Sequence, residues 1–245
     1  MKTGALIELY DVSKAFGNKL ALDRVTLRVG RGKVIGLLGP NGSGKTTLIK
    51  LLNGLIRPTK GEIFIDGQSP GVYTKSIISY LPDKTYFADW MKVKDVLGMF
   101  DEFYQDFDRD KAERMCTTMN ISPEDRIKTM SKGTREKVQL ILVMSRRAQL
   151  YLLDEPIAGV DPAARDYILT TIINNYNEEG TVIISTHLIS DIERILDEVI
   201  FIREGKVVRH EAVDDIKERE GKSIDDVFKD SFRMVPFTGV NENDR

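Results

Sequence analysis

The sequence predicts an α/β fold, a core of strands and helices that is interrupted by a helical insert. Short runs of strand-forming residues with turn signals fill about the first eighty residues, a helical period dominates from residue 93 to about 148, and the strand signal returns at residue 150. With 245 residues and 41% hydrophobic content, the chain is long enough to bury the core that such a fold needs.

The N-terminal part contains candidate strands around one helix. After Lys45 the apolar residues follow a helical spacing, and Gly54 with Pro58 marks the end of that helix. Asp66-Gly67, a hairpin-type dipeptide, closes the last strand. A glycine-rich loop therefore joins a buried strand to a helix N-terminus. The expected strands are IELYDV (7–12), VTLRV (25–29), KVIGLL (33–38) and EIFIDG (62–67).

The middle of the chain has the period of an amphipathic helix. Apolar residues from Val93 to Phe107 mark one helical face, and more helix is expected up to about residue 148. Two short helices are expected after residue 211. A helix is expected around residues 163–177. Strands are expected before and after it, in LYLLDEP (150–156), GTVIISTH (180–187) and DEVIFIREGKVVRH (197–210).

Charge and cysteine content restrict the class of protein. The formal net charge is -2, from 36 basic and 38 acidic side chains, so no overall basic field attracts nucleic acid. Cys116 is the single cysteine and is expected as a small buried side chain in a reducing compartment. The N-terminus shows no signal-peptide pattern, and the apolar runs fall far short of the roughly 18 residues that cross a bilayer. A role at a membrane would need another chain to supply the spanning helices.

The segment GPNGSGKTT, residues 39–47, is the strongest chemical signal. Gly39, Gly44, Lys45 and Thr46 match G-x-x-x-x-G-K-[ST], in which backbone amides surround phosphates, the lysine reaches the terminal pair and the hydroxyl binds Mg²⁺. Glycines let the backbone curl around an anion at the positive end of the following helix. The loop alone leaves kinases, GTPases and ATPases open. The other loop residues assigned to the nucleotide are Asn41, Gly42, Ser43 and Thr47.

Two acids and a histidine at later strand ends narrow this choice. Asp154 ends the apolar strand in LYLLDEP, where a carboxylate that holds Mg²⁺ is expected. Glu155 suits a general base or a water-orienting group, and its alternative role is to cap the next helix or pair with a lysine. His187 ends the strand in TVIISTH. Taken alone it reads as a structural residue, but beside a phosphate loop and an acid pair it is expected to hold the γ-phosphate and water in register.

Together these motifs resemble the ATP-binding subunit of an ABC transporter over residues 5–210. The ordered motifs are the phosphate loop, MSKGTREK (130–137), LYLLDEP, AGVD (158–161) and His187. The resemblance implies a P-loop NTPase core of the RecA-like type, with an N-terminal antiparallel β subdomain and an inserted α-helical signature subdomain. It divides the single domain into an ATP-binding core (1–83 and 149–210), a helical subdomain (84–148) and a short C-terminal helical tail (211–245).

The resemblance also implies a dimer around two ATP molecules. Ser131 and Gly133 open the signature helix and, in the family, bind the γ-phosphate held by a second subunit. Asp161 matches the interface loop that couples the two sites. Phe16 stands where the family places an aromatic ring against adenine, and packing at a strand edge is its alternative role.

Three positions depart from the family pattern. Lys132 replaces the usual glycine of the signature and brings a positive charge toward the opposite phosphate. Asp83 stands where the family normally has a glutamine beside Mg²⁺, and a carboxylate can still coordinate that ion. Ala158 stands where serine is common, which removes one polar contact at the dimer interface.

The expected function is ATP hydrolysis that powers transport. The resemblance implies ATP and Mg²⁺ as cofactors, a separate transmembrane permease subunit and a second ATPase subunit, identical or paralogous, with no nucleic acid. It places the protein in the cytoplasm, peripheral on the inner face of the membrane. SKG and LPD resemble a bacterial subgroup that exports peptides, antibiotics or other amphipathic cargo. The alternative is a soluble ATPase of the same type that acts on ribosomes or DNA. Tyr86, Phe87 and Trp90 are candidate anchors for the permease, with core packing as the alternative role.

Overall fold

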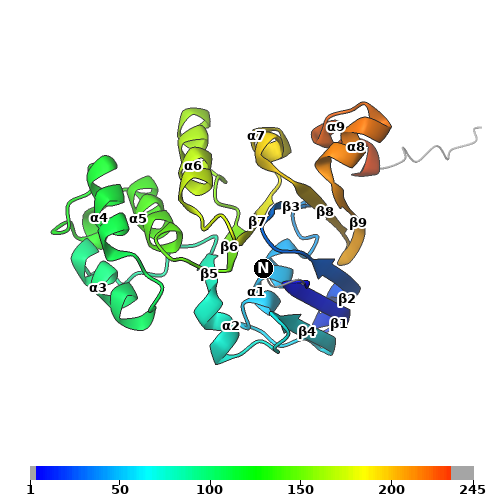
Figure 1. The fold of residues 1–245 in the computed structure, drawn as a ribbon, viewed down its shortest axis with the longest axis horizontal. Coiled ribbons are helices and arrows are strands. Elements are labelled where there is room, and N and C mark those ends of the chain that lie inside the picture. The colour runs from blue at the N-terminus through cyan, green and yellow to red at the C-terminus, as the bar shows by residue number, and fades with distance from the viewer. Residues whose placement is uncertain (1–3, 233–245) are drawn as a thin grey trace, which may run out of the picture.

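The computed structural model describes residues 4–232 and contains two sheets (Figure 1). The smaller sheet is antiparallel, with strand order β2-β1-β4. The larger sheet has the order β5-β6-β7-β3-β8-β9, in which every neighbouring pair is parallel except β8 with β9. The bounds are β1 (Ile7–Phe16), β2 (Lys19–Val29), β3 (Val34–Leu38), β4 (Lys60–Ile65), β5 (Ile78–Leu81), β6 (Leu150–Asp154), β7 (Thr181–Thr186), β8 (Glu198–Arg203) and β9 (Lys206–Ala212).

Helices cover the larger sheet and fill the insert between β5 and β6. Helix α1 lies between the two sheets, and α3, α4 and α5 form a group to one side (Figure 1). The helices are α1 (Lys45–Leu52), α2 (Val72–Ile77), α3 (Val93–Phe103), α4 (Arg109–Thr118), α5 (Lys132–Met144), α6 (Pro162–Asn175), α7 (Ile189–Ile192), α8 (Val213–Glu220) and α9 (Ile224–Phe232), with 3-10 turns η1 (Ile127–Thr129) and η2 (Glu193–Ile195).

The central strands are buried on both faces, which explains their continuous apolar sequences. Leu37 and Leu152 belong to the core shared with α1 and the small sheet. Leu38 and Leu153, the next residues along the same strands, belong to the core shared with the insert and the C-terminal helices. Because successive side chains of a strand point to opposite faces, each strand contributes to both cores.

The predicted strands and the helix after Lys45 are confirmed, and the chain has elements that the periodicity did not reveal. Residues 72–81 form the short helix α2 and the edge strand β5. The helix that begins at Val93 ends at Phe103, and Phe107 packs its ring near Phe100 from the following loop. Phe103 was expected on the apolar face and is 72% exposed. The apolar spacing continues beyond the end of the helix because the loop residues pack against the same core as the helix does.

Candidate functional site

The phosphate loop connects β3 to α1 with a backbone that depends on glycine. A Cβ atom on Gly39 would lie 2.4 Å from the carbonyl oxygen of Ile202. Gly44 has φ of +115°, and its Cβ would lie 2.7 Å from the carbonyl oxygen of Ala21. Side chains at either position would force β8 or β2 to move. The close approach of these strands therefore fixes the loop at the N-terminus of α1.

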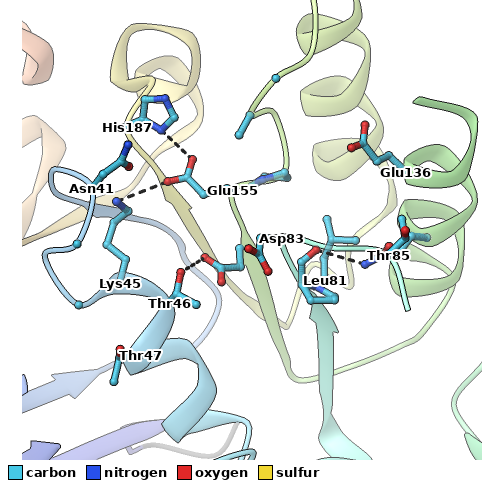
Figure 2. A pocket seen from close by; sticks show the side chains of 18 of the residues that line it. Asn41, Lys45, Thr46, Thr47, Leu81, Asp83, Thr85, Glu136, Glu155 and His187 are labelled. Atoms are coloured by element: carbon cyan, nitrogen blue, oxygen red, sulfur yellow. Dashed lines mark hydrogen bonds and ion pairs between the residues drawn. The ribbon is translucent and has the colours of Figure 1, made fainter. Parts of the chain in front are cut away.

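Lys45, the first residue of α1, is buried at the centre of this loop (Figure 2). Its Nζ donates hydrogen bonds to the carbonyl oxygens of Gly39 at 2.8 Å and Pro40 at 3.3 Å. The same Nζ lies 3.5 Å from Oε1 of Glu155. The ammonium group is thus held inside the curl of the loop, where a phosphate would replace these partners.

Asp154 lies at the carboxyl end of β6 and gathers two hydroxyl groups from neighbouring elements. Its Oδ1 accepts hydrogen bonds from Thr46 Oγ1 at 3.1 Å and from Ser185 Oγ at 2.6 Å. Since β3, β6 and β7 are adjacent and parallel, their carboxyl ends meet at one edge of the sheet. That edge brings together the loop threonine and the acid that the sequence assigns to a metal.

The other oxygen of Asp154 gives a test of the metal assignment. Oδ2 is buried and has no hydrogen-bond partner. Burial raises the pKa of Asp154, the bonds from Ser185 and Thr46 lower it, and repulsion by Asp83 and Glu155 raises it further. A buried acceptor of this kind fits a cation bound at the site.

A magnesium ion needs few protein ligands beside a nucleotide. Among residues 4–232 no group of three or more His, Cys, Asp or Glu side chains has the arrangement of a metal site. Mg²⁺ keeps several waters and is typically held by one or two carboxylates together with substrate phosphates. The residues of this edge therefore fit Mg²⁺ that arrives with a nucleotide.

Glu155 leaves the sheet in a left-handed backbone conformation, with φ of +52°. Its amide donates to the carbonyl oxygen of Ser185 at 3.0 Å and to Ser185 Oγ at 3.1 Å. Its Oε2 lies 3.0 Å from Nδ1 of His187, opposite the contact with Lys45 (Figure 2). Nδ1 must donate in this bond because an ionised carboxylate only accepts, so in the neutral ring Nε2 is an acceptor.

These side chains line one cavity of about 680 Å³. Phe16 is half exposed at its wall, and the Nζ of Lys14 lies 5.0 Å from the ring centroid. Gly39 and Ser43 form the buried part of the loop and do not line the cavity. The predicted residues that do line it are Phe16, Asn41, Gly42, Gly44, Lys45, Thr46, Thr47, Asp83, Asp154, Glu155 and His187.

Besides Gly39 and Ser43, three residues assigned to the nucleotide lie outside this cavity, and all three come from elements other than the phosphate loop. Ser131 is the N-cap of α5, and its Oγ accepts a hydrogen bond from the Thr134 amide at 3.1 Å. Gly133 is exposed, and a Cβ there would meet no atom within 4 Å. Asp161 is exposed just before α6. Lys132, in contrast, lines the cavity of its own chain, with Nζ 3.7 Å from Glu136.

The sequence reasoning missed two polar residues at this site. Ser185 is fully buried and connects Asp154 to the Glu155 amide. Gln139 is buried in α5 and lines the cavity. The available signal in both cases was a polar residue within an otherwise apolar run, TVIIS and VQLILVM.

Comparison with known proteins identifies the family. The model of the ABC transporter family matches residues 22–158, from β2 to the turn after Glu155. The chain belongs to the ABC transporter family. Over 216 residues it is 35% identical to an uncharacterised ABC transporter ATP-binding protein of Methanocaldococcus jannaschii, covering 86% of this chain and 79% of the relative. It is 28% identical to SkfE of Bacillus subtilis, a SkfA peptide export ATP-binding protein, covering 83% of this chain and 88% of that relative.

A solved structure also supports the fold. The ATP-binding subunit of an ABC transporter superposes with a TM-score of 0.81 at 26% identity, covering 93% of this chain and all of that one. The ABC transporter subunit described here is accordingly a P-loop ATPase with an antiparallel β subdomain and a parallel core sheet. Within residues 4–232, no helix has the length and apolarity required to span a bilayer.

Proposed function

We propose that this ABC transporter subunit hydrolyses ATP as a dimer that encloses two ATP·Mg²⁺ and drives export through a separate permease. The observation that carries the proposal is the convergence of Lys45, Thr46, Asp154, Glu155 and His187 in one cavity at the carboxyl ends of β3, β6 and β7. This arrangement supplies a phosphate cradle, metal ligands and a base within a few ångströms of one another.

Binding of the nucleotide frees the catalytic base. Lys45 and the loop amides bind the phosphates, so the Lys45 ammonium exchanges its carbonyl and Glu155 partners for phosphate oxygens. Thr46, Asp154 and Asp83 would hold Mg²⁺, which when bound neutralises phosphate charge.

Glu155 then accepts a proton from, or orients, the attacking water. His187 donates Nδ1–H to Glu155 and so fixes that carboxylate, while Nε2 would accept a hydrogen bond from the attacking water. In this tautomer the neutral ring can orient the water but cannot bind a phosphate oxygen, so the role expected for His187 is limited to the water.

The dimer would complete each site with groups from the second subunit. Ser131, Gly133 and Asp161 are exposed and lie outside the cavity of their own chain. The open space around Gly133 permits a phosphate held by another subunit to approach the amides of the first turn of α5. The second subunit would be identical or paralogous.

The permease would bind beside α3. Trp90 and Tyr86 are 74% and 51% exposed, whereas Phe87 packs against the core. We assign Trp90 and Tyr86 to a groove for a short cytoplasmic helix of the permease, which would hold the subunit at the inner face of the membrane. The relationship to SkfE, whose name describes peptide export, supports peptide or amphipathic cargo.

The test is affinity capture of tagged Glu155→Gln protein from its own cells, with ATP present and membranes solubilised in detergent. Because this variant lacks the base, it is expected to keep the ATP-bound dimer closed and to retain weak partners. A polytopic membrane protein should be captured. Lys45→Ala, which lacks the phosphate-binding cation, is the matched control and should not form the ATP-dependent dimer. Recovery of ribosomes or DNA-bound proteins with no membrane chain would contradict the transport role.

A further inference from the structure

The loop after β5 places a carboxylate opposite Asp154 and is attached to α5. β5 ends at Leu81, and Pro82 and Asp83 follow it on the cavity wall. Figure 2 shows Asp83 reaching into the cavity from this loop, across from Thr46. Asp83, Thr46 and Asp154 all line this one cavity. The direction of the Asp83 side chain therefore matters to the metal edge of the site.

Gln139 fastens this loop to α5. Its side-chain Nε2 donates a hydrogen bond to the carbonyl oxygen of Pro82 at 3.3 Å. That carbonyl belongs to the peptide group that continues into Asp83, and proline has a fixed φ. With its carbonyl held, this peptide group can no longer rotate freely, so the Asp83 Cα keeps one orientation.

The amide of Gln139 is an exception within α5. Gln139 is 2% exposed and stands between Val138 and Leu140, in a run of buried apolar residues that continues to Met144. A buried amide costs free energy unless it is hydrogen-bonded, and an apolar side chain would fill this place without that cost. Packing alone thus gives no reason for glutamine here.

We propose that Gln139 is a positioning residue that aims Asp83 at the metal bound with ATP. The inference rests on the proposed role of Asp83 as a metal ligand. Gln139 acts through the Pro82 carbonyl and does not itself touch the metal. Groups that orient a ligand in this way typically contribute about ten- to a hundredfold to metal affinity.

Ser79 provides a matched comparison. Its Oγ donates to the carbonyl oxygen of Val143 at 2.9 Å, so it also joins β5 to α5 through one buried hydrogen bond. This bond lies before Leu81 and does not reach the peptide between Pro82 and Asp83. A role that is only structural would make Ser79→Ala and Gln139→Met equivalent.

The experiment measures how much a metal adds to ATP binding. In a Glu155→Gln background, which prevents hydrolysis, the dissociation constant of a fluorescent ATP is measured in EDTA and with excess Mn²⁺. The dissociation constant in EDTA divided by the dissociation constant in Mn²⁺ gives the contribution of the metal to ATP binding. Gln139→Met should lower this ratio by about tenfold and Asp83→Ala by at least as much, whereas Ser79→Ala should leave it nearly unchanged. Gln139→Asn, whose shorter amide does not span to Pro82, repeats the test if the methionine variant fails to fold.

The outcomes separate this inference from the proposed function. If Asp83→Ala lowers the ratio and Gln139→Met does not, Asp83 is a metal ligand and the role of Gln139 is wrong. If Asp83→Ala leaves the ratio unchanged, the proposed metal role of Asp83 fails, and the inference fails with it. An equal loss in Ser79→Ala would mean that general attachment of α5, and not the Pro82 carbonyl, controls the site.

Discussion

At the scale of single residues, the fold keeps one carboxylate of the candidate site buried. Asp154 is 1% exposed, and only one of its two oxygens has hydrogen-bond partners. A carboxylate in this state is destabilised in the absence of a cation. If Asp154 binds Mg²⁺ as proposed, the binding would relieve this cost.

This cost predicts an unusual pH dependence. Because the pKa of Asp154 is raised in the folded protein, the folded state binds that proton more tightly than the unfolded state. The charge therefore costs stability at neutral pH, and the cost disappears as pH falls below the unfolded value near 3.8. Without nucleotide or metal, Asp154→Asn should melt above the wild type at neutral pH, and the difference in melting temperature should shrink on acidification.

Asp108 supplies a control of opposite sign. The backbone amide of Lys111 is the main cause that lowers the pKa of Asp108, and the Arg147 side chain adds to it. Its charge is stabilising above the unfolded value, so Asp108→Asn should melt below the wild type at neutral pH and approach it in acid. A neutral-pH melting temperature for Asp154→Asn below that of the wild type would show that the buried charge is already compensated.

At the scale of elements, the helical insert is joined to the sheet by buried polar side chains as well as by apolar packing. The guanidinium of Arg146 pairs with Asp106 and donates to the carbonyl oxygens of Ser76 and Ile78, so the end of α5 is tied to the start of β5. Lys111, which is half-buried, connects the insert to helix α6. From α4 its Nζ donates to the carbonyl oxygen of Met144, 2.7 Å away, and to that of Asn175.

Lys111 therefore caps the C-terminal ends of α5 and α6 with one ammonium group. Lys111→Met should lower the free energy of unfolding by about 1–3 kcal/mol, because two carbonyl groups lose a partly buried donor. Chemical denaturation measures this change. Lys229→Met is the matched control, since Lys229 pairs with Asp225 on an exposed face of α9, and it should leave the stability nearly unchanged. Equal stability of the two variants would contradict the capping role.

At the scale of the whole molecule, the exposed aromatic residues near α3 bear on how the subunit meets a partner. The chain has one tryptophan, so its fluorescence reports on Trp90 alone. At 74% exposure, Trp90 should emit at the long wavelength of a hydrated indole and be quenched readily by iodide.

Reconstitution with the captured permease should shift this emission to shorter wavelength and protect it from iodide. Tyr86→Ala should weaken that assembly while leaving ATP binding unchanged, because Tyr86 lies outside the nucleotide cavity. A blue-shifted, protected emission in the isolated subunit would instead place Trp90 in the core.

Much of this architecture was predictable from local pattern. The strand before the phosphate loop, the helix after it, and the strands that end at Asp154 and Thr186 follow from apolar runs and turn residues. α2 and β5 were not predicted because both are short and their apolar and polar residues do not alternate in a clear pattern. The prediction for Phe103 was wrong because a helical period assigns a residue to a face of the helix but does not show whether that face is still covered at the last turn. The subdomain limits and the individual site roles remain predictions.

By itself, the sequence determined the family and the α/β class, because phosphate binding requires particular residues at fixed spacing along a strand and a helix. Only the tertiary structure decided which groups meet. Ser185 reaches Asp154, His187 reaches Glu155 and Gln139 reaches Pro82 across 31, 32 and 57 positions. Such contacts depend on strand order and helix placement, which are set by burying two cores on opposite faces of one sheet. A polar residue in an apolar run can mark one partner of such a contact, but nothing local identifies the other.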